Sequence, residues 1–366
     1  MRVLFAGEPT KGHLYPIIAV IEKLREEAEK NSEDAEFMLI SVKSDVLGDI
    51  FEEAKVPYKV ILAPISTKPN PLGSLMMPVG FFQALWYLFN YMPDVIFTKG
   101  GYVSIPVAMA AWILRIPIMI HESDYDPQPV DKFLARFAKR IAISFERTSE
   151  VYKSPKKVVF TGNPVLSVIS GGNREAARKE FVLSEGKPTI LILAGTLGAK
   201  LINDLVIEVL PQLLEKYQII HQCGIDNYDK IRALVEKMNI HNLNDYHLFP
   251  FFRNRAANAY AACDLVISRA GANTVSEIMT VGKPCILIPL STAVSDEQTK
   301  NAFFYSETGA AILVSEKNLK PNLLLSIIAE VFTSSLKALE MERAARKMAH
   351  PAAAEKIVQE LMDISK

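Results

Sequence analysis

Cysteine, net charge and long apolar runs are what this chain of 366 residues has least of. Its three cysteines (Cys223, Cys263 and Cys285) are an odd number without a CxxC spacing. This excludes a disulfide scaffold and a cysteine zinc site, and it fits a reducing cytoplasm. The 41 Lys and Arg residues balance 41 Asp and Glu residues, and zero net charge argues against a nucleic-acid-binding protein.

No uncharged apolar run reaches the length of about 18 residues that a membrane-spanning helix needs. The nearest approach, residues 75–89, is interrupted by Pro78 and Gln83. The N-terminus lacks the long apolar stretch of a signal peptide, so we expect no export. The mean hydropathy of +0.15 is nevertheless high for a soluble enzyme, and this apolar excess needs an explanation.

Short apolar runs alternate with longer amphipathic stretches along nearly the whole chain. Unbroken apolar strands separated by helices are typical of parallel sheets covered on both faces. The length and the restart of the pattern at residue 189 predict an α/β protein of two doubly wound, Rossmann-like domains. We expect domains at 1–165 and 166–340, with C-terminal helices at 341–366 packing back on the first domain. The predicted strands are 3–6, 37–42, 59–62, 95–98, 116–121, 140–144, 158–161, 189–194, 219–222, 247–251, 265–268, 285–289 and 311–314.

In parallel sheets, ligands bind beyond the carboxyl ends of the strands, so chemistry is expected where strands lead into helices. The first such junction is GEPTKGH at 7–13. Its glycines permit a tight turn before a helix whose free N–H groups suit an anion, although it is neither a Walker A loop nor GxGxxG. His13 is therefore either a surface residue at the helix start or, beside Thr10 and Gly12, part of a binding site.

Two further junctions lie in the first half of the chain. Gly100 and Gly101 precede a helix, which an ordinary tight turn explains equally well. The segment HESDYD at 121–126 ends a buried strand with ionisable side chains, which is costly unless they are solvated or bind a ligand. Asp124 and Asp126 have a spacing found in metal sites but common in loops, and we expect no metal.

The second half of the chain has two comparable junctions. GTLGA at 195–199 follows a strand and opens a helix, as a diphosphate cradle does. In SRAGANTVSE at 268–277, Gly271 and Ala272 allow close backbone approach. Glu277 lies one turn into the helix, where it can accept hydrogen bonds from a vicinal diol such as ribose. A capped helix with Glu in its first turn also explains Glu277.

Taken in order, these motifs resemble the MurG family of glycosyltransferases, the UDP-N-acetylglucosamine:N-acetylmuramyl-(pentapeptide) pyrophosphoryl-undecaprenol N-acetylglucosamine transferases. The resemblance covers essentially the whole chain. Each motif alone is weak, but seven in order are specific. The matching segments are Thr10-x-Gly12-His13, Gly100-Gly101-Tyr102-Val103-Ser104-x-Pro106, His121-Glu122, Gly162-Asn163-Pro164-Val165, Gly195-Thr196-x-Gly198-Ala199, 268–277, and Gly282-Lys283-Pro284 followed by Gln298 and Asn301-Ala302.

The resemblance implies a glycosyltransferase B-type fold with a cleft between an acceptor-binding first domain and a donor-binding second domain. It implies inverting, metal-independent and cofactor-free transfer of N-acetylglucosamine from UDP to lipid-linked muramyl-pentapeptide (lipid I to lipid II) in peptidoglycan synthesis. The donor-binding residues that it implies are Thr10, Gly12, Asn163, Thr196, Gly198, Arg269, Gly271, Ala272, Asn273, Thr274, Glu277, Glu297 and Gln298. The acceptor-side residues are Gly100, Gly101, Tyr102, Ser104, His121 and Asp124.

The same resemblance places His13 and Glu122 at the catalytic centre. Inverting transfer needs a base to take the proton of the acceptor hydroxyl, and either histidine or a carboxylate has a suitable pKa. Which of the two residues is the base stays open on the sequence.

The chain departs from the family pattern mainly in its first half, so donor chemistry is better supported than the identity of the acceptor. Lys200 or Arg269 are candidates to replace the arginine that is missing at position 166. The departures are Glu8, Pro9 and Lys11 in a loop usually richer in glycine, Ser123-Asp124 for Gln-Asn, Asp131 for Asn, and Leu166 for Arg.

Residues 78–89 carry more aromatic side chains than one buried helix face needs, although they also suit a core helix. A lipid-linked acceptor requires contact with a membrane. The resemblance therefore implies a cytoplasmic protein, peripheral on the inner face of the cell membrane, that binds through an amphipathic patch. The predicted patch is Phe81, Phe82, Leu85, Trp86 and Phe89.

Three other functions stay open on the sequence. One is a related UDP-sugar transferase with a different lipid acceptor. Another is a non-catalytic UDP-sugar binder, which the altered first loop and Leu166 suggest. The third is a dinucleotide-dependent oxidoreductase, since doubly wound folds often bind a dinucleotide. Against it, the chain lacks the GxGxxG motif.

Overall fold

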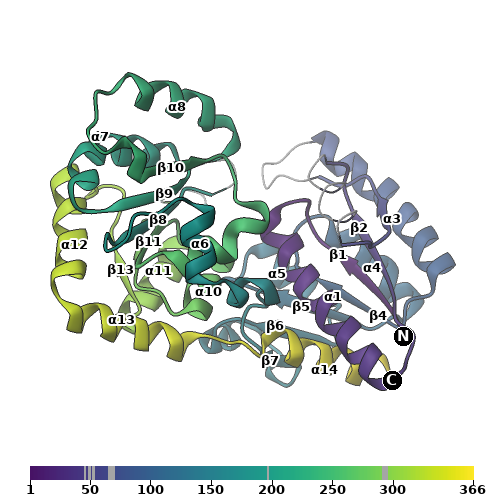
Figure 1. Ribbon diagram of the computed structural model, residues 1–366. Coiled ribbons are helices and arrows are strands. Elements are labelled where there is room, and N and C mark those ends of the chain that lie inside the picture. Colours follow the sequence, from purple (N-terminus) through teal and green to yellow (C-terminus); the bar gives the residue numbers. More distant parts are fainter. Residues whose placement is uncertain (45–46, 48–50, 52–53, 65–70, 196–197, 291–295) are drawn as a thin grey trace. The chain divides into compact units, whose positions relative to one another are not determined.

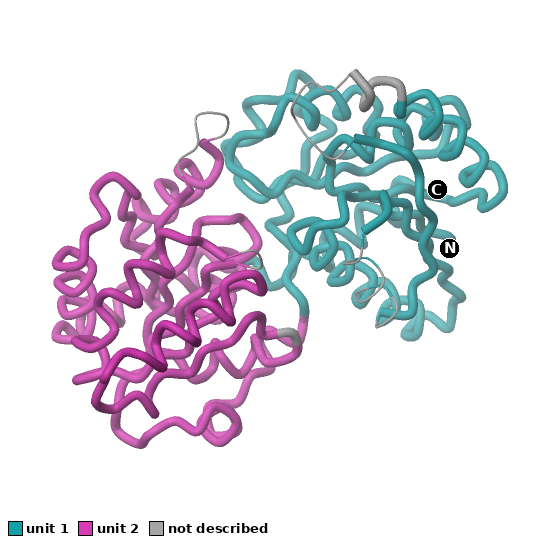
Figure 2. The backbone as a smooth tube through the Cα atoms, turned by 90° about the horizontal axis from the view of Figure 1, so that it is seen from above, with its two compact units in different colours: residues 1–166, 350–366 teal, residues 167–349 magenta. Residues whose placement is uncertain are grey.

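The structure is a computed structural model that describes residues 1–366 except 45–46, 48–50, 52–53, 65–70, 196–197 and 291–295. The chain divides into two compact units (Figure 2). Unit 1 consists of residues 1–166 and 350–366, and unit 2 of residues 167–349. Each unit contains one parallel sheet accompanied by helices (Figure 1), which confirms the predicted fold class.

The sheet of unit 1 has seven parallel strands in the order β3-β2-β1-β4-β5-β6-β7. The first strand, β1, is buried on both faces from Val3 to Ala6, as its unbroken apolar sequence requires. The strands are β1 (Arg2–Ala6), β2 (Glu36–Ser41), β3 (Tyr58–Val60), β4 (Val95–Thr98), β5 (Ile118–Glu122), β6 (Arg140–Ile143) and β7 (Val158–Phe160). The helices are α1 (Lys11–Asn31), α3 (Pro71–Tyr91), α4 (Ser104–Leu114), α5 (Pro129–Leu134), α14 (Ala353–Ser365) and the 3-10 turns η1 (Glu146–Val151) and η2 (Pro155–Lys157).

The sheet of unit 2 has six parallel strands in the order β10-β9-β8-β11-β12-β13. They are β8 (Thr189–Leu193), β9 (Gln218–Gln222), β10 (Tyr246–Phe249), β11 (Leu265–Ser268), β12 (Cys285–Leu287) and β13 (Ala311–Leu313). The helices are α6 (Arg174–Glu180), α7 (Lys200–Lys216), α8 (Tyr228–Lys237), α9 (Ala256–Ala262), α10 (Ala272–Val281), α11 (Glu297–Glu307), α12 (Pro321–Thr333) and α13 (Ser335–Met348). The 3-10 turns are η3 (Ser167–Gly171), η4 (Ile225–Asn227), η5 (Leu243–Asp245) and η6 (Arg253–Arg255).

Both strand orders reverse direction once, between β1 and β4 in unit 1 and between β8 and β11 in unit 2. At such a reversal the loops after the two central strands leave toward opposite faces of the sheet, which opens a crevice where ligands bind. The loops concerned are 7–10 and 99–103 in unit 1, and 194–199 and 269–271 in unit 2. These are four of the five junctions that the sequence singles out.

The last helix returns to unit 1, where α14 packs along α1. Arg140 Nε lies 2.8 Å from Glu360 Oε2, and Lys139 donates to the carbonyl of Ile364 at 3.1 Å. Gly162 borders this return, because at its φ of +84° a Cβ atom would lie 2.3 Å from that of His350. Helix α13 belongs to unit 2, so the chain returns at residue 350 rather than at 341.

Helix α14 presents Ile357, Val358, Leu361 and Ile364 to the core that β1 and α1 form. We expect Leu361→Ala to lower the free energy of unfolding of unit 1 by about 3 kcal/mol, because it removes a fully buried side chain and leaves a cavity. Urea unfolding followed by circular dichroism measures this loss. The matched control is Gln359→Ala on the exposed face of α14, for which we expect a change within about 0.5 kcal/mol. Equal stability of the two variants would contradict the packing described.

Candidate functional site

The carboxyl ends of the strands in unit 1 gather buried charged groups around Lys99, which directly follows β4 and is only 5% exposed. Its Nζ lies 2.7 Å from Nδ1 of His121 and 3.5 Å from Oδ1 of Asn163. His121 Nε2 donates to the carbonyl of Gly162 at 3.0 Å, so Nδ1 is the acceptor and the ring is neutral. Burial, helped by the charge of Lys99, holds the pKa of His121 well below its usual value. Burial lowers the pKa of Lys99 to about 8, and nearby carboxylates oppose this shift.

Glu122, at the end of β5, is the buried carboxylate of this cluster. Its Oε1 accepts a hydrogen bond from the backbone N–H of Asp124 at 2.9 Å. Its Oε2 is buried and has no hydrogen-bond partner among the described residues. Burial first, and then the charges of Asp131 and Asp124, raise the pKa of Glu122 well above that of an ordinary glutamate. The site thus contains a carboxylate oxygen that can still take a proton.

Two carboxylates occupy the glycine loop between β4 and α4. The backbone N–H of Gly101 donates to Asp131 Oδ1 at 3.2 Å, and that of Tyr102 donates to Glu8 Oε1 at 3.1 Å. Gly100 and Gly101 have φ values of +80° and +78°, and Asp131 packs so closely on Gly100 that a Cβ would lie 2.0 Å from its Oδ1. Consecutive N–H groups in such a turn bind anions, and here the anions are the protein's own carboxylates, Asp131 and Glu8.

Burial raises the pKa of both carboxylates in the glycine loop, that of Asp131 to about 7, although the N–H groups oppose the shift. Glu8 and Asp131 are two of the departures from the family pattern. The motifs of the sequence do not predict that Glu8, Asp131 or Lys99 belongs to the site. The only sequence signal for Lys99 is a lysine between a buried strand and paired glycines.

His13 lies in the first turn of α1, and its Nδ1 accepts a hydrogen bond from the backbone N–H of Glu8 at 3.3 Å. The proton of the neutral ring is therefore on Nε2. Burial, and then the charge of Lys99, lower the pKa of His13 to about 3, so the ring stays neutral at physiological pH. In this tautomer Nε2 is a hydrogen-bond donor and cannot accept a proton.

The other predicted residues of unit 1 surround this cluster. Ser104 donates to the carbonyl of Gly100 at 2.6 Å, which closes the glycine loop onto the start of α4. Thr10 is exposed just before α1, and Gly12 is in its first turn. The structure thus brings His13, His121, Glu122 and Asn163 together around Lys99, as the strand-end argument predicts.

In unit 2, Glu277 lies on α10, one turn after the junction that follows β11. Its Oε2 accepts a hydrogen bond from the hydroxyl of Tyr260 on α9 at 2.8 Å. Burial raises the pKa of Glu277 to about 7, and the Tyr260 hydrogen bond opposes this shift. Gly271, at the N-cap of α10, has no neighbour within 4 Å of the place where a Cβ would be, so the backbone there is open to a ligand.

Gly198, shortly before α7, packs against the turn after β9. Gly198 has φ of +84°, and a Cβ there would lie 2.4 Å from the carbonyl oxygen of Cys223. Asn203 on α7 donates a hydrogen bond from Nδ2 to that same carbonyl at 2.9 Å. The other polar side-chain atom of Asn203, Oδ1, lies 3.0 Å from Nε2 of His221, which holds the amide in place. The predicted residue Thr196 lies outside the described residues.

The remaining predicted donor residues are partly engaged by the protein. Arg269 lies 2.6 Å from Glu316 Oε1 and donates to the carbonyl of Ile288 at 3.1 Å. Gln298 accepts from the backbone N–H of Leu290 at 3.0 Å, which leaves its NH₂ group for another partner. The others lie on two helices: Ala272, buried, and Asn273 and Thr274, half-buried, begin α10, and the half-buried Glu297 begins α11.

The predicted membrane patch divides into two faces of α3. Phe82, Trp86 and Phe89 point outward and are 67%, 66% and 63% exposed, whereas Phe81 and Leu85 pack on the core of unit 1. The exposed Trp112 of α4, which packs along α3, continues the apolar surface. Among the described residues, no single helix is long and apolar enough to cross a membrane. One pair bent by 91°, Pro321–Thr333 with Ser335–Ser365, meets that criterion only when combined.

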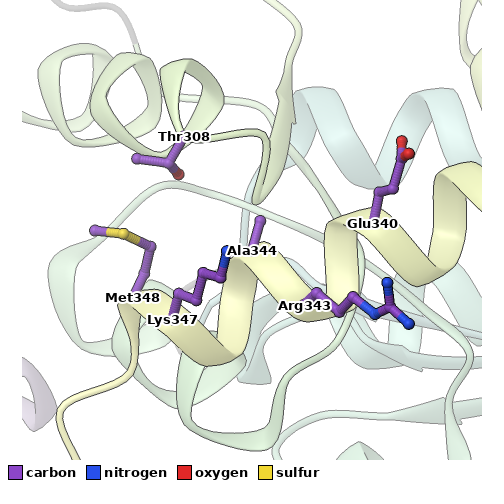
Figure 3. A pocket seen from close by; sticks show the side chains of 6 residues that line it. All are labelled: Thr308, Glu340, Arg343, Ala344, Lys347 and Met348. Atoms are coloured by element: carbon purple, nitrogen blue, oxygen red, sulfur yellow. The ribbon is translucent and has the colours of Figure 1, made fainter.

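A pocket of about 310 Å³ lies elsewhere on unit 2, between the end of α11 and α13. Figure 3 shows Thr308 facing α13, which contributes the other five lining side chains. They include the charged Glu340, Arg343 and Lys347 but none of the predicted donor residues. In the part of the chain that the structure describes, no three His, Cys, Asp or Glu side chains are arranged to hold a metal ion. Metal independence stays a prediction.

Comparison with known proteins agrees with this arrangement. Residues 3–143 match the glycosyltransferase family 28 N-terminal domain, and residues 189–357 match the C-terminal domain of the same family. The UDP-N-acetylglucosamine–N-acetylmuramyl-(pentapeptide) pyrophosphoryl-undecaprenol N-acetylglucosamine transferase of Listeria monocytogenes is 32% identical, with 100% of both chains covered. The corresponding transferase 3 of Bacillus thuringiensis is 34% identical, over 90% of this chain and 91% of that protein.

Solved structures show the same architecture. The crystal structure of Acinetobacter baumannii MurG is 27% identical and has a TM-score of 0.74, with 99% of each chain covered. The UDP-GlcNAc 2-epimerase of Neisseria meningitidis, bound to UDP-GlcNAc, has a TM-score of 0.73 over 99% of this chain and 100% of that one. At 17% identity it shows the fold alone. The fold and the family predicted from the motifs are confirmed, and the chain belongs to the MurG family of glycosyltransferase family 28.

Proposed function

We propose that this chain transfers N-acetylglucosamine from UDP-N-acetylglucosamine to lipid-linked muramyl-pentapeptide, forming lipid II from lipid I in peptidoglycan synthesis. One observation carries the proposal: the chain is related from end to end to the Listeria enzyme whose name states this reaction. The presence of both family 28 domains supports it, because the transfer needs a donor side and an acceptor side.

Unit 2 supplies the groups for the donor. Glu277 accepts the two ribose hydroxyls at the start of α10, where the backbone at Gly271 is open. The N–H groups that begin α7, beside Gly198, face the diphosphate and stabilise the negative charge of the departing UDP. Gln298 and Glu297 bind hydroxyls of the sugar, for which the NH₂ group of Gln298, which donates to no other described residue, is suited.

Unit 1 supplies the groups for the acceptor. A base takes the proton of an acceptor hydroxyl, whose oxygen then attacks the anomeric carbon of N-acetylglucosamine while the bond to UDP breaks, so UDP leaves with the electron pair and the configuration inverts. We assign the base to Glu122, which has an unpartnered buried oxygen and a raised pKa. His13, neutral and protonated on Nε2, donates a hydrogen bond to the reacting groups.

The exposed aromatic surface of α3 and α4 brings the protein to its lipid-linked acceptor at the inner face of the membrane. Phe82, Trp86 and Phe89 are spaced so that they share one helix face. Arg136 adds a cation near this surface, because it lies over the ring of Phe133, which packs in turn against Phe137. Anionic lipid would attract such a cation.

The acceptor decides between this function and the alternatives. We expect UDP release from UDP-N-acetylglucosamine to depend on a short-chain muramyl-pentapeptide lipid, measured by a coupled assay for UDP. A diacylglycerol acceptor is the control. UDP release that never depends on the muramyl lipid would contradict the proposal. UDP binding without turnover on any acceptor would instead indicate a sugar-nucleotide binder.

The assignment of the base predicts the pH profile. Glu122 must be ionised to accept a proton, so kcat, measured at saturating donor, falls as the pH drops through its raised pKa, well above the value of an ordinary glutamate. Saturating donor removes the effect of donor binding from the pH profile. His13→Ala lowers kcat by about tenfold or more but leaves this acidic limb in place, because His13 does not titrate there. Glu122→Gln, of equal size, removes the limb together with most of the activity. An acidic limb that disappears in His13→Ala would make His13 the base.

The aromatic surface predicts membrane binding. We expect Trp86→Ser to weaken co-sedimentation with vesicles of mixed anionic and neutral lipid several-fold, because it removes a large apolar side chain from the contact. UDP affinity stays unchanged and reports that the protein is folded. The control is Leu336→Ser, which alters an apolar side chain of unit 2 with a similar exposure of 64%. Equal vesicle binding by both variants would overturn the assignment.

A further inference from the structure

Tyr260 is a buried tyrosine that the reaction described above does not use. It is 2% exposed on α9, and its hydroxyl donates to Glu277 Oε2 at 2.8 Å. Among the described residues, this is the one hydrogen bond of the Tyr260 hydroxyl and of the Glu277 carboxylate. A buried hydroxyl aimed at a carboxylate proposed to bind the ligand calls for a functional explanation.

A carboxylate that accepts two ribose hydroxyls must meet two requirements: it must be ionised, and it must keep a fixed orientation. Tyr260 serves both. Its O–H fixes Oε2 and leaves Oε1 to the ligand, and it stabilises the charged form against the cost of burial. We propose that Tyr260 is a positioning residue that holds Glu277 oriented and ionised for the ribose hydroxyls of the donor nucleotide. This inference rests on the role given to Glu277 in the proposed function.

The other groups packed around α10 leave this role to Tyr260. Among the residues that the structure describes, Tyr260 is the one polar group whose interaction with Glu277 opposes the effect of burial on the pKa of Glu277. The segment η3 contributes no titratable group. The remaining titratable groups near α10 are neutral or engaged elsewhere. Cys263 and Cys285 are buried neutral thiols, and Lys283 donates to the carbonyl of Cys263. Tyr305 is hydrogen-bonded to Ser276, and Arg346 packs against Gly282 at the far end of α10.

The sign of the pH effect follows from these contacts. The pKa of Glu277 is about 7, so the carboxylate loses its charge, and the nucleotide its acceptor, as the pH falls through neutrality. Tyr260→Phe keeps the ring but removes the hydrogen bond that lowers the pKa of Glu277. The variant therefore begins to lose affinity for the nucleotide at a higher pH than the wild type. If the pKa of Glu277 rises by about one in the variant, the ratio of Kd in the variant to Kd in the wild type rises from near one at pH 8.5 toward about tenfold at pH 6.

The experiment is calorimetric titration of the full chain with UDP between pH 6 and pH 8.5. The ratio of variant to wild type at each pH cancels the titration of the phosphates of the ligand. The control is Tyr305→Phe, which removes another buried hydroxyl facing α10 but one bonded to Ser276, and whose ratio we expect to be independent of pH. A ratio for Tyr260→Phe that is flat with pH, or the same pH-dependent rise in Tyr305→Phe, overturns the inference.

Replacing Tyr260 by a ring-fluorinated tyrosine keeps the test decisive if Tyr260→Phe does not fold. The more acidic hydroxyl is a stronger donor, so the loss of affinity should move to lower pH, and an unmoved curve counts against the inference.

Glu277→Ala separates this test from that of the proposed function. The wild type should prefer UDP to 2′-deoxy-UDP, and the variant should lose both affinity and preference. An unchanged preference would refute the ribose role of Glu277, whatever Tyr260→Phe shows.

Discussion

Both sheets contain only parallel strands, and this constraint decides where polar groups can lie. With helices accompanying both sheets, the central strands β1, β4, β8 and β11 are buried and mostly apolar, and each pairs with a strand on either side. In these four strands the buried polar side chains, Thr98, Thr189 and Ser268, are the first or last residue of their strand. The site residues Lys99, Glu122 and Glu277 accordingly follow a strand, end a strand or lie on the helix after it.

The two sheets use the same position for opposite electrostatics. In unit 1, one buried ammonium faces several carboxylates, so the cluster cannot be fully ionised in a low-dielectric surrounding, and the pKa values of Glu122 and Asp131 rise. In unit 2, a single carboxylate faces a neutral hydroxyl. The first arrangement suits proton transfer, because its carboxylates have raised pKa values and so bind protons more tightly than ordinary carboxylates. The second suits recognition of a neutral diol, because it offers one charge with a fixed direction.

The sequence predicted the positions of all thirteen strands to within two or three residues, because buried parallel strands are written as short apolar runs between helices. It also predicted which strand ends carry the polar groups. It did not predict that Lys99 lies at the centre of the first cluster or that Tyr260 contacts Glu277, since both depend on contacts between distant segments. The sequence could not predict the tautomer of His13 either. The partner of its Nδ1 is a backbone N–H group, which every residue except proline has, so the type of residue at that position does not reveal the contact.

The two cations that the sequence offers in place of the family arginine at position 166 are both engaged by carboxylates. Arg269 is paired with Glu316, and Lys200 pairs with Asp204 on the exposed surface of α7. Drawing either cation to a ligand would break its ion pair, which for the half-buried pair of Arg269 and Glu316 is costly. The proposed function gives the diphosphate to backbone N–H groups at the start of α7, which carry partial positive charge and need no counter-ion. Gly198 packs closely against the carbonyl of Cys223, which Asn203 holds in place, so the backbone that leads directly into these N–H groups has a fixed position.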